Sequence, residues 1–221
     1  MKKMISIILI LLVIFIGMAV YKYKIITNSQ IKIDDVNRIE EYIAKIYCWK
    51  EITQEALPKF DNINDAPEKW IWEVVKNNSE EYELTYEQIN NKAEEIFEKQ
   101  FSKKYPQEGT DSFQYNEETG MYIATEIQTD KKDDSFFVKK ITKTQNGYEV
   151  EILEYLQDYT AYEQNKVLLK NLNEEIIATL DIEEVETKTI DTLKNNINKF
   201  STKKITLKYS NENLYVEKIE G

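Results

Sequence analysis

An uncharged apolar run near the start of the chain, residues 4–20, limits the architecture more than any other sequence feature. In a helix that rises about 1.5 Å per residue, this run spans roughly 26 Å, close to the roughly 30 Å of a bilayer's hydrocarbon core. Lys3, Lys22 and Lys24 flank the run and can extend their amines into the headgroups. We therefore expect residues 1–24 to form an N-terminal transmembrane anchor of a single-pass membrane protein.

A cleavable signal peptide is the alternative for the same residues. Gly17, Met18 and Ala19 offer a small-x-small cleavage pattern, although no polar stretch precedes it. Cleavage there would release a secreted domain. The lysines on the two sides of the segment are nearly balanced, so the positive-inside rule does not set its orientation. If the segment is retained, the short tail before it predicts a cytoplasmic N-terminus and an extracytoplasmic domain.

Charge and composition exclude several functional classes. The chain has 29 basic and 40 acidic side chains, a formal net charge of −11, which repels nucleic acid. It has no histidine, and Cys48 is its one cysteine, so an internal disulfide, a histidine-dependent triad and the usual zinc sites are excluded. We expect no nucleic-acid partner, no cofactor, no metal and no enzymatic activity, with Cys48 as a buried, inert thiol.

Three helices are predicted after a short polar connector at residues 25–33. The first runs over about residues 34–50, with Asp34 or Asp35 as its N-cap. The second follows Asp65 as cap, with Pro67 in its first turn, where a missing N–H costs nothing. The third begins with the capping-box pattern of Thr85 and Gln88 and carries a favourable pair of Glu95 with Lys99.

After Phe113 the apolar period changes from 3.6 to 2, which predicts strands. Asn146 and Gly147 are the residue types that a two-residue type I′ turn requires, and they predict a β-hairpin. That turn would pair Ile141 with Ile152, Phe137 with Leu156 and Lys139 with Glu154 on one face, and Thr142 with Glu151 and Val138 with Tyr155 on the other.

Further strands complete the pattern. Residues 113–115 with 121–127, and 167–169 with 176–180, predict two more hairpins; residues 190–200 have helical spacing; and residues 203–221 predict a last hairpin with its loop at 210–213. The tetrapeptide Lys-Lys-Ile-Thr occurs at 139–142 and again at 203–206, by duplication or because two hairpins share the same pattern. The order of elements predicts one α+β domain over residues 34–221, without disulfides, whose helices cover one face of a curved antiparallel sheet.

This order, helices leading into a long antiparallel meander over residues 34–221, resembles the NTF2-like or cystatin-like architecture. The resemblance lies in element order alone and implies a curved sheet wrapped around helices. The apolar start at residues 4–20, together with abundant lysine, isoleucine and asparagine against the single Arg38, also resembles uncharacterised membrane-anchored extracytoplasmic proteins of low-GC Gram-positive bacteria.

Aromatic side chains are the candidate contact residues. Tyrosine and tryptophan give rigid, amphipathic contact area, and we assign ligand or partner binding to Tyr155, Tyr159, Tyr162 and Trp72. We expect a membrane-tethered, noncatalytic extracytoplasmic module that binds a protein or cell-envelope component. The alternatives are a small-ligand carrier with an NTF2-like pocket and a carboxylate-dependent cell-wall hydrolase.

Overall fold

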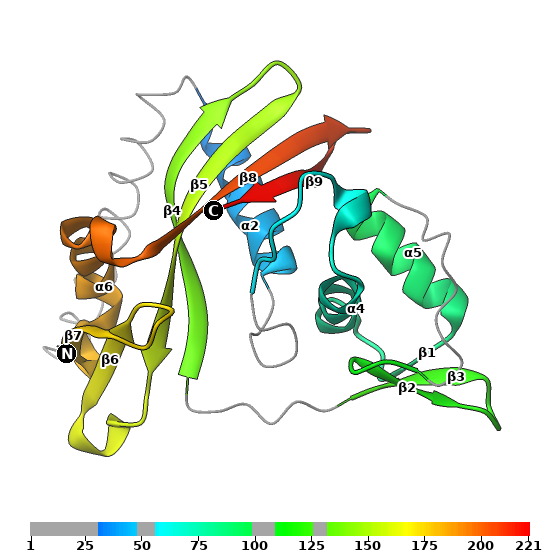
Figure 1. Ribbon diagram of the computed structural model, residues 1–221, viewed down its shortest axis with the longest axis horizontal. Helices are drawn as coiled ribbons and strands as arrows, with labels where there is room; N and C mark the ends of the chain where they lie inside the picture. Colours follow the sequence, from blue (N-terminus) through cyan, green and yellow to red (C-terminus); the bar gives the residue numbers. More distant parts are fainter. Residues whose placement is uncertain (1–30, 48–55, 99–108, 126–131) are drawn as a thin grey trace, which may run out of the picture.

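The computed structural model describes residues 31–47, 56–98, 109–125 and 132–221, which form an α+β fold of four α-helices and two antiparallel sheets (Figure 1). The predicted anchor at residues 4–20 and Cys48 lie outside these residues. None of the described helices is long and apolar enough to cross a membrane. The predicted α+β class is confirmed, and the single cysteine leaves no internal disulfide.

The first two helices begin differently from the prediction. α2 (Ile33–Ile46) starts one residue earlier, and Asp34 and Asp35 lie in its first turn, where a negative charge favours the helix dipole, instead of capping it. α4 (Glu68–Asn77) has Pro67 as its N-cap, and the predicted cap Asp65 belongs to the 3₁₀ turn η1 (Ile63–Asp65).

The other two helices follow the predicted segments more closely. α5 (Tyr86–Phe97) confirms the capping box, because Thr85 Oγ1 accepts from the Gln88 backbone while the Gln88 side chain bonds back to Thr85. α6 (Val185–Asn195) starts five residues before the predicted 190–200 segment and gives way to the 3₁₀ turn η4 (Ile197–Lys199). Lys99 lies outside the described residues, and Glu95 pairs with Lys92 at 2.7 Å.

A small sheet packs beside α4 and α5. The predicted hairpin forms as β2 (Phe113–Asn116) and β3 (Met121–Ala124), and β3 also pairs with β1 (Glu83–Leu84) in the order β1-β3-β2. β1 has only two residues, too few for an alternating pattern, so periodicity did not predict it.

The large sheet is built around β5 (Gly147–Asp158), which is flanked on one edge by β4 (Lys132–Lys143). Its other edge is shared. Residues 147–154 pair with β8 (Ser201–Ser210), which in turn pairs with β9 (Asn213–Glu220), whereas residues 156–158 pair with β6 (Lys166–Lys170), which pairs with β7 (Ile176–Asp181). The sheet therefore forks beside Tyr155, and Asn171 closes the fork by donating to the Lys199 carbonyl oxygen at 3.2 Å.

The β4–β5 hairpin forms, but its predicted register is wrong. Ile141 pairs with Val150, and beyond a bulge between Val138 and Lys140 the pairing shifts again, so that Val138 faces Ile152. Gly147 has no positive φ and belongs to β5. A Cβ on it would lie 2.0 Å from the Leu207 carbonyl oxygen, so glycine is needed for the close approach of β8. The two positive φ angles of a type I′ turn occur instead at Asn211 and Glu212, between β8 and β9.

The two faces of β5 carry different cores. The large core takes Tyr148, Val150 and Ile152 from β5 and joins them to buried side chains of α2, α4, α5, β8, β9 and the small sheet. The small core takes Leu153 and Tyr155 from the opposite face and joins them to Leu169, Leu193 and Phe200. In Figure 1 the elements of the small core lie around one end of the β4–β5 ribbon and those of the large core around the other. We call these two halves the large lobe and the small lobe.

Candidate functional site

The structure does not gather the four aromatic residues to which the sequence assigned binding into one site. Trp72 is 1% exposed in the large core, and Tyr155 is 9% exposed in the small core, where burial raises its pKa. Tyr159 lies close enough to Tyr155 to influence that pKa, and its hydroxyl donates to Gln157 Oε1 at 2.8 Å. Tyr162, in the 3₁₀ turn η2 (Tyr162–Gln164), is 60% exposed. A contact role for the half-buried Tyr159 and exposed Tyr162 stays a prediction.

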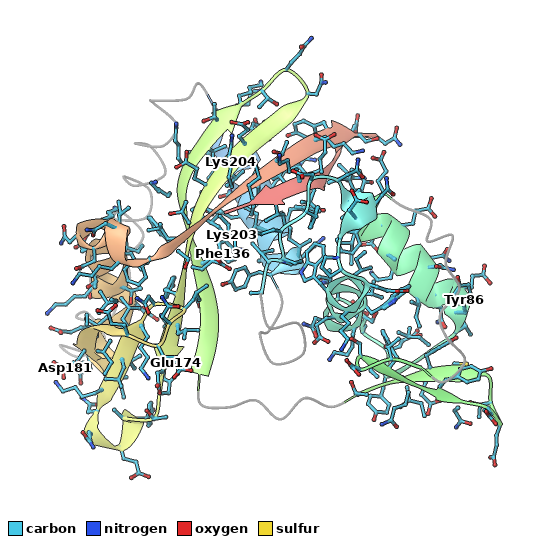
Figure 2. The ribbon with its side chains drawn as sticks, in the orientation of Figure 1. Tyr86, Phe136, Glu174, Asp181, Lys203 and Lys204 are labelled. Atoms are coloured by element: carbon cyan, nitrogen blue, oxygen red, sulfur yellow. The ribbon has the colours of Figure 1, made fainter. Side chains whose placement is uncertain are left out.

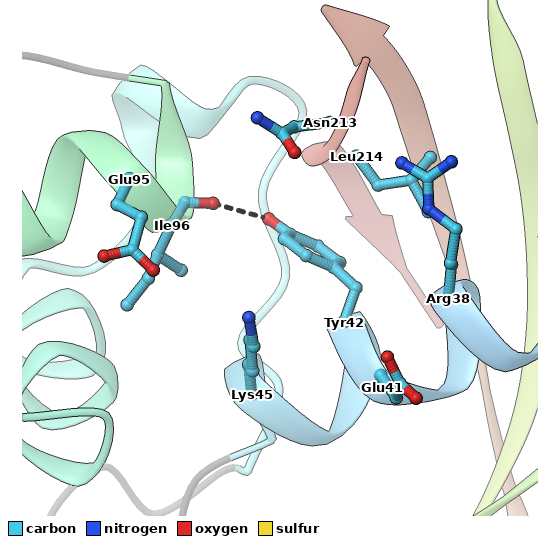
Figure 3. A pocket seen from close by; sticks show the side chains of 8 residues that line it. All are labelled: Arg38, Glu41, Tyr42, Lys45, Glu95, Ile96, Asn213 and Leu214. Atoms are coloured by element: carbon cyan, nitrogen blue, oxygen red, sulfur yellow. Dashed lines mark hydrogen bonds between the residues drawn. The ribbon is translucent and has the colours of Figure 1, made fainter. Parts of the chain in front are cut away.

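A hollow of about 190 Å³ lies in the large lobe, where α2, α5 and the start of β9 meet (Figure 3). Its lining combines both charges with one aromatic ring and one amide: Arg38, Glu41, Tyr42 and Lys45 from α2, Glu95 and Ile96 from α5, and Asn213 and Leu214 from β9. The α2 residues recur every three or four positions, so one face of this helix forms a wall of the hollow.

Polar contacts join α2, α5 and the β8–β9 hairpin to one another around this hollow. Between α2 and α5, the Tyr42 hydroxyl donates to the Ile96 carbonyl oxygen at 2.9 Å and accepts from the Val216 backbone N–H at 2.9 Å. Burial raises the pKa of Tyr42, so this hydroxyl keeps its proton at physiological pH. One side chain thus connects α2 with α5 and with β9 at the same time.

Glu98 joins α5 to the β8–β9 hairpin. It ends α5 in the left-handed conformation, with φ 52°, and this geometry directs its carboxylate toward β8. The carboxylate accepts from the Ser210 hydroxyl and pairs with the Lys208 ammonium at 3.2 Å. The hydrogen bond from Ser210, with that from Lys208 beside it, lowers the pKa of Glu98, so the contact persists in mildly acidic solution.

Arg38 closes the ring between α2 and the hairpin. Its guanidinium donates to the Glu212 carbonyl oxygen and lies 5.7 Å from the centre of the Tyr209 ring. The Tyr209 hydroxyl is within 3.4 Å of both Asp35 and the Tyr148 hydroxyl. Arg38 forms no ion pair with a carboxylate of the described residues, so its charge is oriented but not neutralised.

A second hollow, of about 310 Å³, continues along α5 from the first. It is lined by Ser79, Glu80, Glu81 and Leu84 on one side and by Gln88, Asn91, Lys92 and Glu95 of α5 on the other. Glu95 lines both hollows, and the α5 residues recur at helical spacing along one stripe. We call the two hollows together the α5 furrow.

Several charged side chains are buried outside the furrow. Glu73 is fully buried in α4, where it pairs with Lys76 at 2.8 Å and accepts from the Ser112 hydroxyl at 3.0 Å. The contact with Ser112 joins α4 to the residue just before β2. Glu154 and Lys203 are buried on the face of the large sheet that packs against α2, on the same side as Phe136 (Figure 2). Because these groups have little or no exposed surface, we interpret them as structural.

The furrow holds polar groups of the kind used for binding. The parts of the chain that the structure describes contain no cluster of three or more acidic or cysteine side chains that could hold a metal. Arg38 and Lys45 can pair with an anionic group, while Glu80 and Glu81 can pair with a cationic one. With no histidine in the chain, the general acid–base residue most often used by enzymes is missing.

Sequence reasoning missed the furrow because three segments far apart in the chain create it. One signal was available. Arg38 is the single arginine among 29 basic residues, and arginine is chosen over lysine where a planar donor must stack on a ring and bond in a fixed direction. Comparison of the chain with protein-family models, curated proteins and solved structures finds no match.

Proposed function

We propose that this protein is a noncatalytic binding module and that the α5 furrow holds its partner. The observation that carries this proposal is the ring of contacts through Tyr42, Glu98 and Arg38, which joins all three walls of the first hollow. A site that is already formed before binding loses less conformational entropy when the partner arrives. The same contacts hold the guanidinium of Arg38 in a fixed position, and a recognition surface needs its charged groups held in this way.

The proposal includes attachment to the membrane through residues 4–20, with the domain outside the cell. The uncharged length of that run supports it, and the short connector at residues 25–33 would keep the furrow close to the bilayer. Protease added to intact cells should then digest the domain, and alkaline extraction should leave the protein in the membrane fraction. Release by alkaline extraction would contradict attachment, and complete protection from protease would contradict the outward orientation.

A filled core favours this proposal over the small-ligand carrier. A carrier of the NTF2-like kind would enclose its ligand between the helices and the concave face of the sheet. In the large lobe Val150, Ile152 and Ile205 are fully buried on that face, in one core with Val36 and Ile39 of α2. The hydrolase alternative needs two carboxyl groups set for acid–base chemistry in one cleft, and of the two in the first hollow, Glu41 and Glu95, the second already pairs with Lys92 at 2.7 Å.

Photo-crosslinking in the full-length protein tests the proposal. A photoreactive amino acid at Asn213 or Lys45 lies in the first hollow, whereas the same group at Lys199 is exposed in the small lobe. We expect one shared adduct from the two furrow positions, absent at Lys199 and reduced by Arg38→Ala. Equal labelling at all three positions, or no adduct at the furrow positions with crosslinking controls that work, would overturn the binding role of the furrow.

A further inference from the structure

Resting on the binding role proposed above, we propose that the α5 furrow recognises a dipolar peptide segment of about four extended residues. Its acidic end lies against Arg38 and Lys45 in the first hollow, and its basic end lies against Glu80 and Glu81 in the second. The segment belongs to a partner protein or peptide and is defined by charges of opposite sign at its two ends.

The cations that lack a carboxylate partner lie at the α2 end of the furrow. Arg38 bonds to a backbone carbonyl oxygen and to a ring face, and Lys45 forms no ion pair with a described residue. Asn213 adds an amide that can donate to the same anionic group. Glu95, at the junction of the two hollows, is neutralised by Lys92 and is not counted here. Glu41 offsets one of the two cations, so the α2 end of the furrow has one net positive charge.

The opposite end of the furrow is acidic. Glu80 and Glu81 are exposed beside Leu84, and among the described residues Glu81 accepts only from the uncharged Gln88 amide, at 2.7 Å. Figure 2 shows Tyr86, the first residue of α5, at the end of the helix next to the small sheet, so this acidic end is remote from the β8–β9 hairpin. The charge therefore changes sign along the furrow, and a partner of uniform charge would be repelled at one end.

The length of α5 sets the length of the segment. Gln88 lines the second hollow and Ile96 the first, and eight residues of helix advance by about 12 Å. An extended peptide covers that distance with about four residues, at about 3.3 Å each. A single free amino acid is too short to reach both charged ends.

Two capped hexapeptides of the same composition separate end-to-end polarity from net charge. One has two aspartates, two glycines and two lysines in that order, and the other alternates aspartate and lysine around the glycines. The binding is measured with the full-length protein in detergent at about 50 mM salt, where screening is moderate. We expect the peptide with grouped charges to bind at least tenfold more tightly than the alternating peptide. Lys45→Glu should abolish that preference and increase the affinity for a peptide with lysines at both ends. The matched control Lys199→Glu should change neither.

The outcomes distinguish this inference from the proposed function. Equal affinities for the two peptides, or a Lys45→Glu variant that keeps the wild-type preference, would overturn the dipolar segment. If furrow crosslinking still succeeded in that case, the binding role would stand. Loss of binding to every peptide in Lys45→Glu, with an unchanged circular dichroism spectrum, would also count against the inference, because it predicts a change of preference.

Discussion

The two lobes share one strand but are stabilised in different ways. In the large lobe Trp70 packs between Phe60 and Phe97, with ring centroids 5.5 and 5.3 Å apart, inside a core that draws on nearly every helix. The small lobe has few buried apolar side chains and relies more on polar contacts, such as the Asp158–Lys170 pair at 2.5 Å and the bonds of Asn171. A large apolar core can support unpaired charges on its surface, and the α5 furrow lies on that lobe.

Truncating the centre of the large core should have the largest effect. Trp70 is fully buried, and its indole N–H donates to the carbonyl oxygens of Ile46 and Ala56 at 3.1 and 3.2 Å. Trp70→Ala would leave a large cavity and two carbonyl oxygens without that donor, so we expect a loss of about 4 kcal/mol in the free energy of unfolding. Urea denaturation monitored by circular dichroism would measure it.

Leu193→Ala truncates a fully buried side chain of the small core. We expect it to cost about 2 kcal/mol, because it deletes fewer atoms than Trp70→Ala and fewer neighbours surround them. Since both lobes use β5, each variant should unfold in one cooperative transition. Two separate transitions, or a larger loss in Leu193→Ala than in Trp70→Ala, would contradict the comparison of the lobes.

Local signals in the sequence predicted local structure well. The capping box at Thr85, the β6–β7 and β8–β9 hairpins and the amphipathic face of α2 all depend on residues within a few positions of one another. The β4–β5 register could not be predicted in the same way, because the approach of β8 to Gly147 depends on a strand distant in sequence and because a bulge before Lys140 shifts the pairing a second time. The furrow required three such segments, so no local pattern indicated it.

The repeated tetrapeptide acquires a physical explanation in the structure. Both copies flank β5 in the same register, so that Ile141 and Ile205 lie on either side of Val150. Lys140 and Lys204 likewise lie on either side of Glu151, on the opposite face. Two strands that pair with the same central strand experience the same alternation of apolar core and acidic surface, which favours the same residues in both without requiring a duplication.

Replacing Gly147 with alanine tests how tightly β5 and β8 are joined. The new Cβ would lie 2.0 Å from the Leu207 carbonyl oxygen, so the two strands must separate. We expect Gly147→Ala to lower the free energy of unfolding by about 3 kcal/mol, the upper end of the range for overpacking. Denaturation in urea would measure the loss.

Gly120→Ala is the control, because Gly120 has φ +70° with nothing within 4 Å of a new Cβ. Its cost should be near 1 kcal/mol, from the left-handed conformation alone. A smaller effect at Gly147 than at Gly120 would show that β8 can move away freely, and the large lobe would then be less tightly joined than we infer.

Acid should weaken the small lobe through Asp158. Burial alone would raise the pKa of this carboxyl, but hydrogen bonds from Lys170 and Thr160 outweigh it and hold the pKa at about 2, below the ordinary 3.8. The folded state therefore favours the charged form, and the resulting stability is present above about pH 4 and fades as the pH falls through 2. By linkage this contribution is roughly 2 kcal/mol.

We expect wild type and Asp158→Asn to differ most in urea midpoint near pH 6 and to converge toward pH 2. Asp181→Asn removes a half-exposed pair with Lys166, serves as the control and should change the urea midpoint little at pH 6. A difference between wild type and Asp158→Asn that stays constant with pH would mean that Asp158 contributes through packing, and the small lobe would then depend on polar contacts no more than the large one.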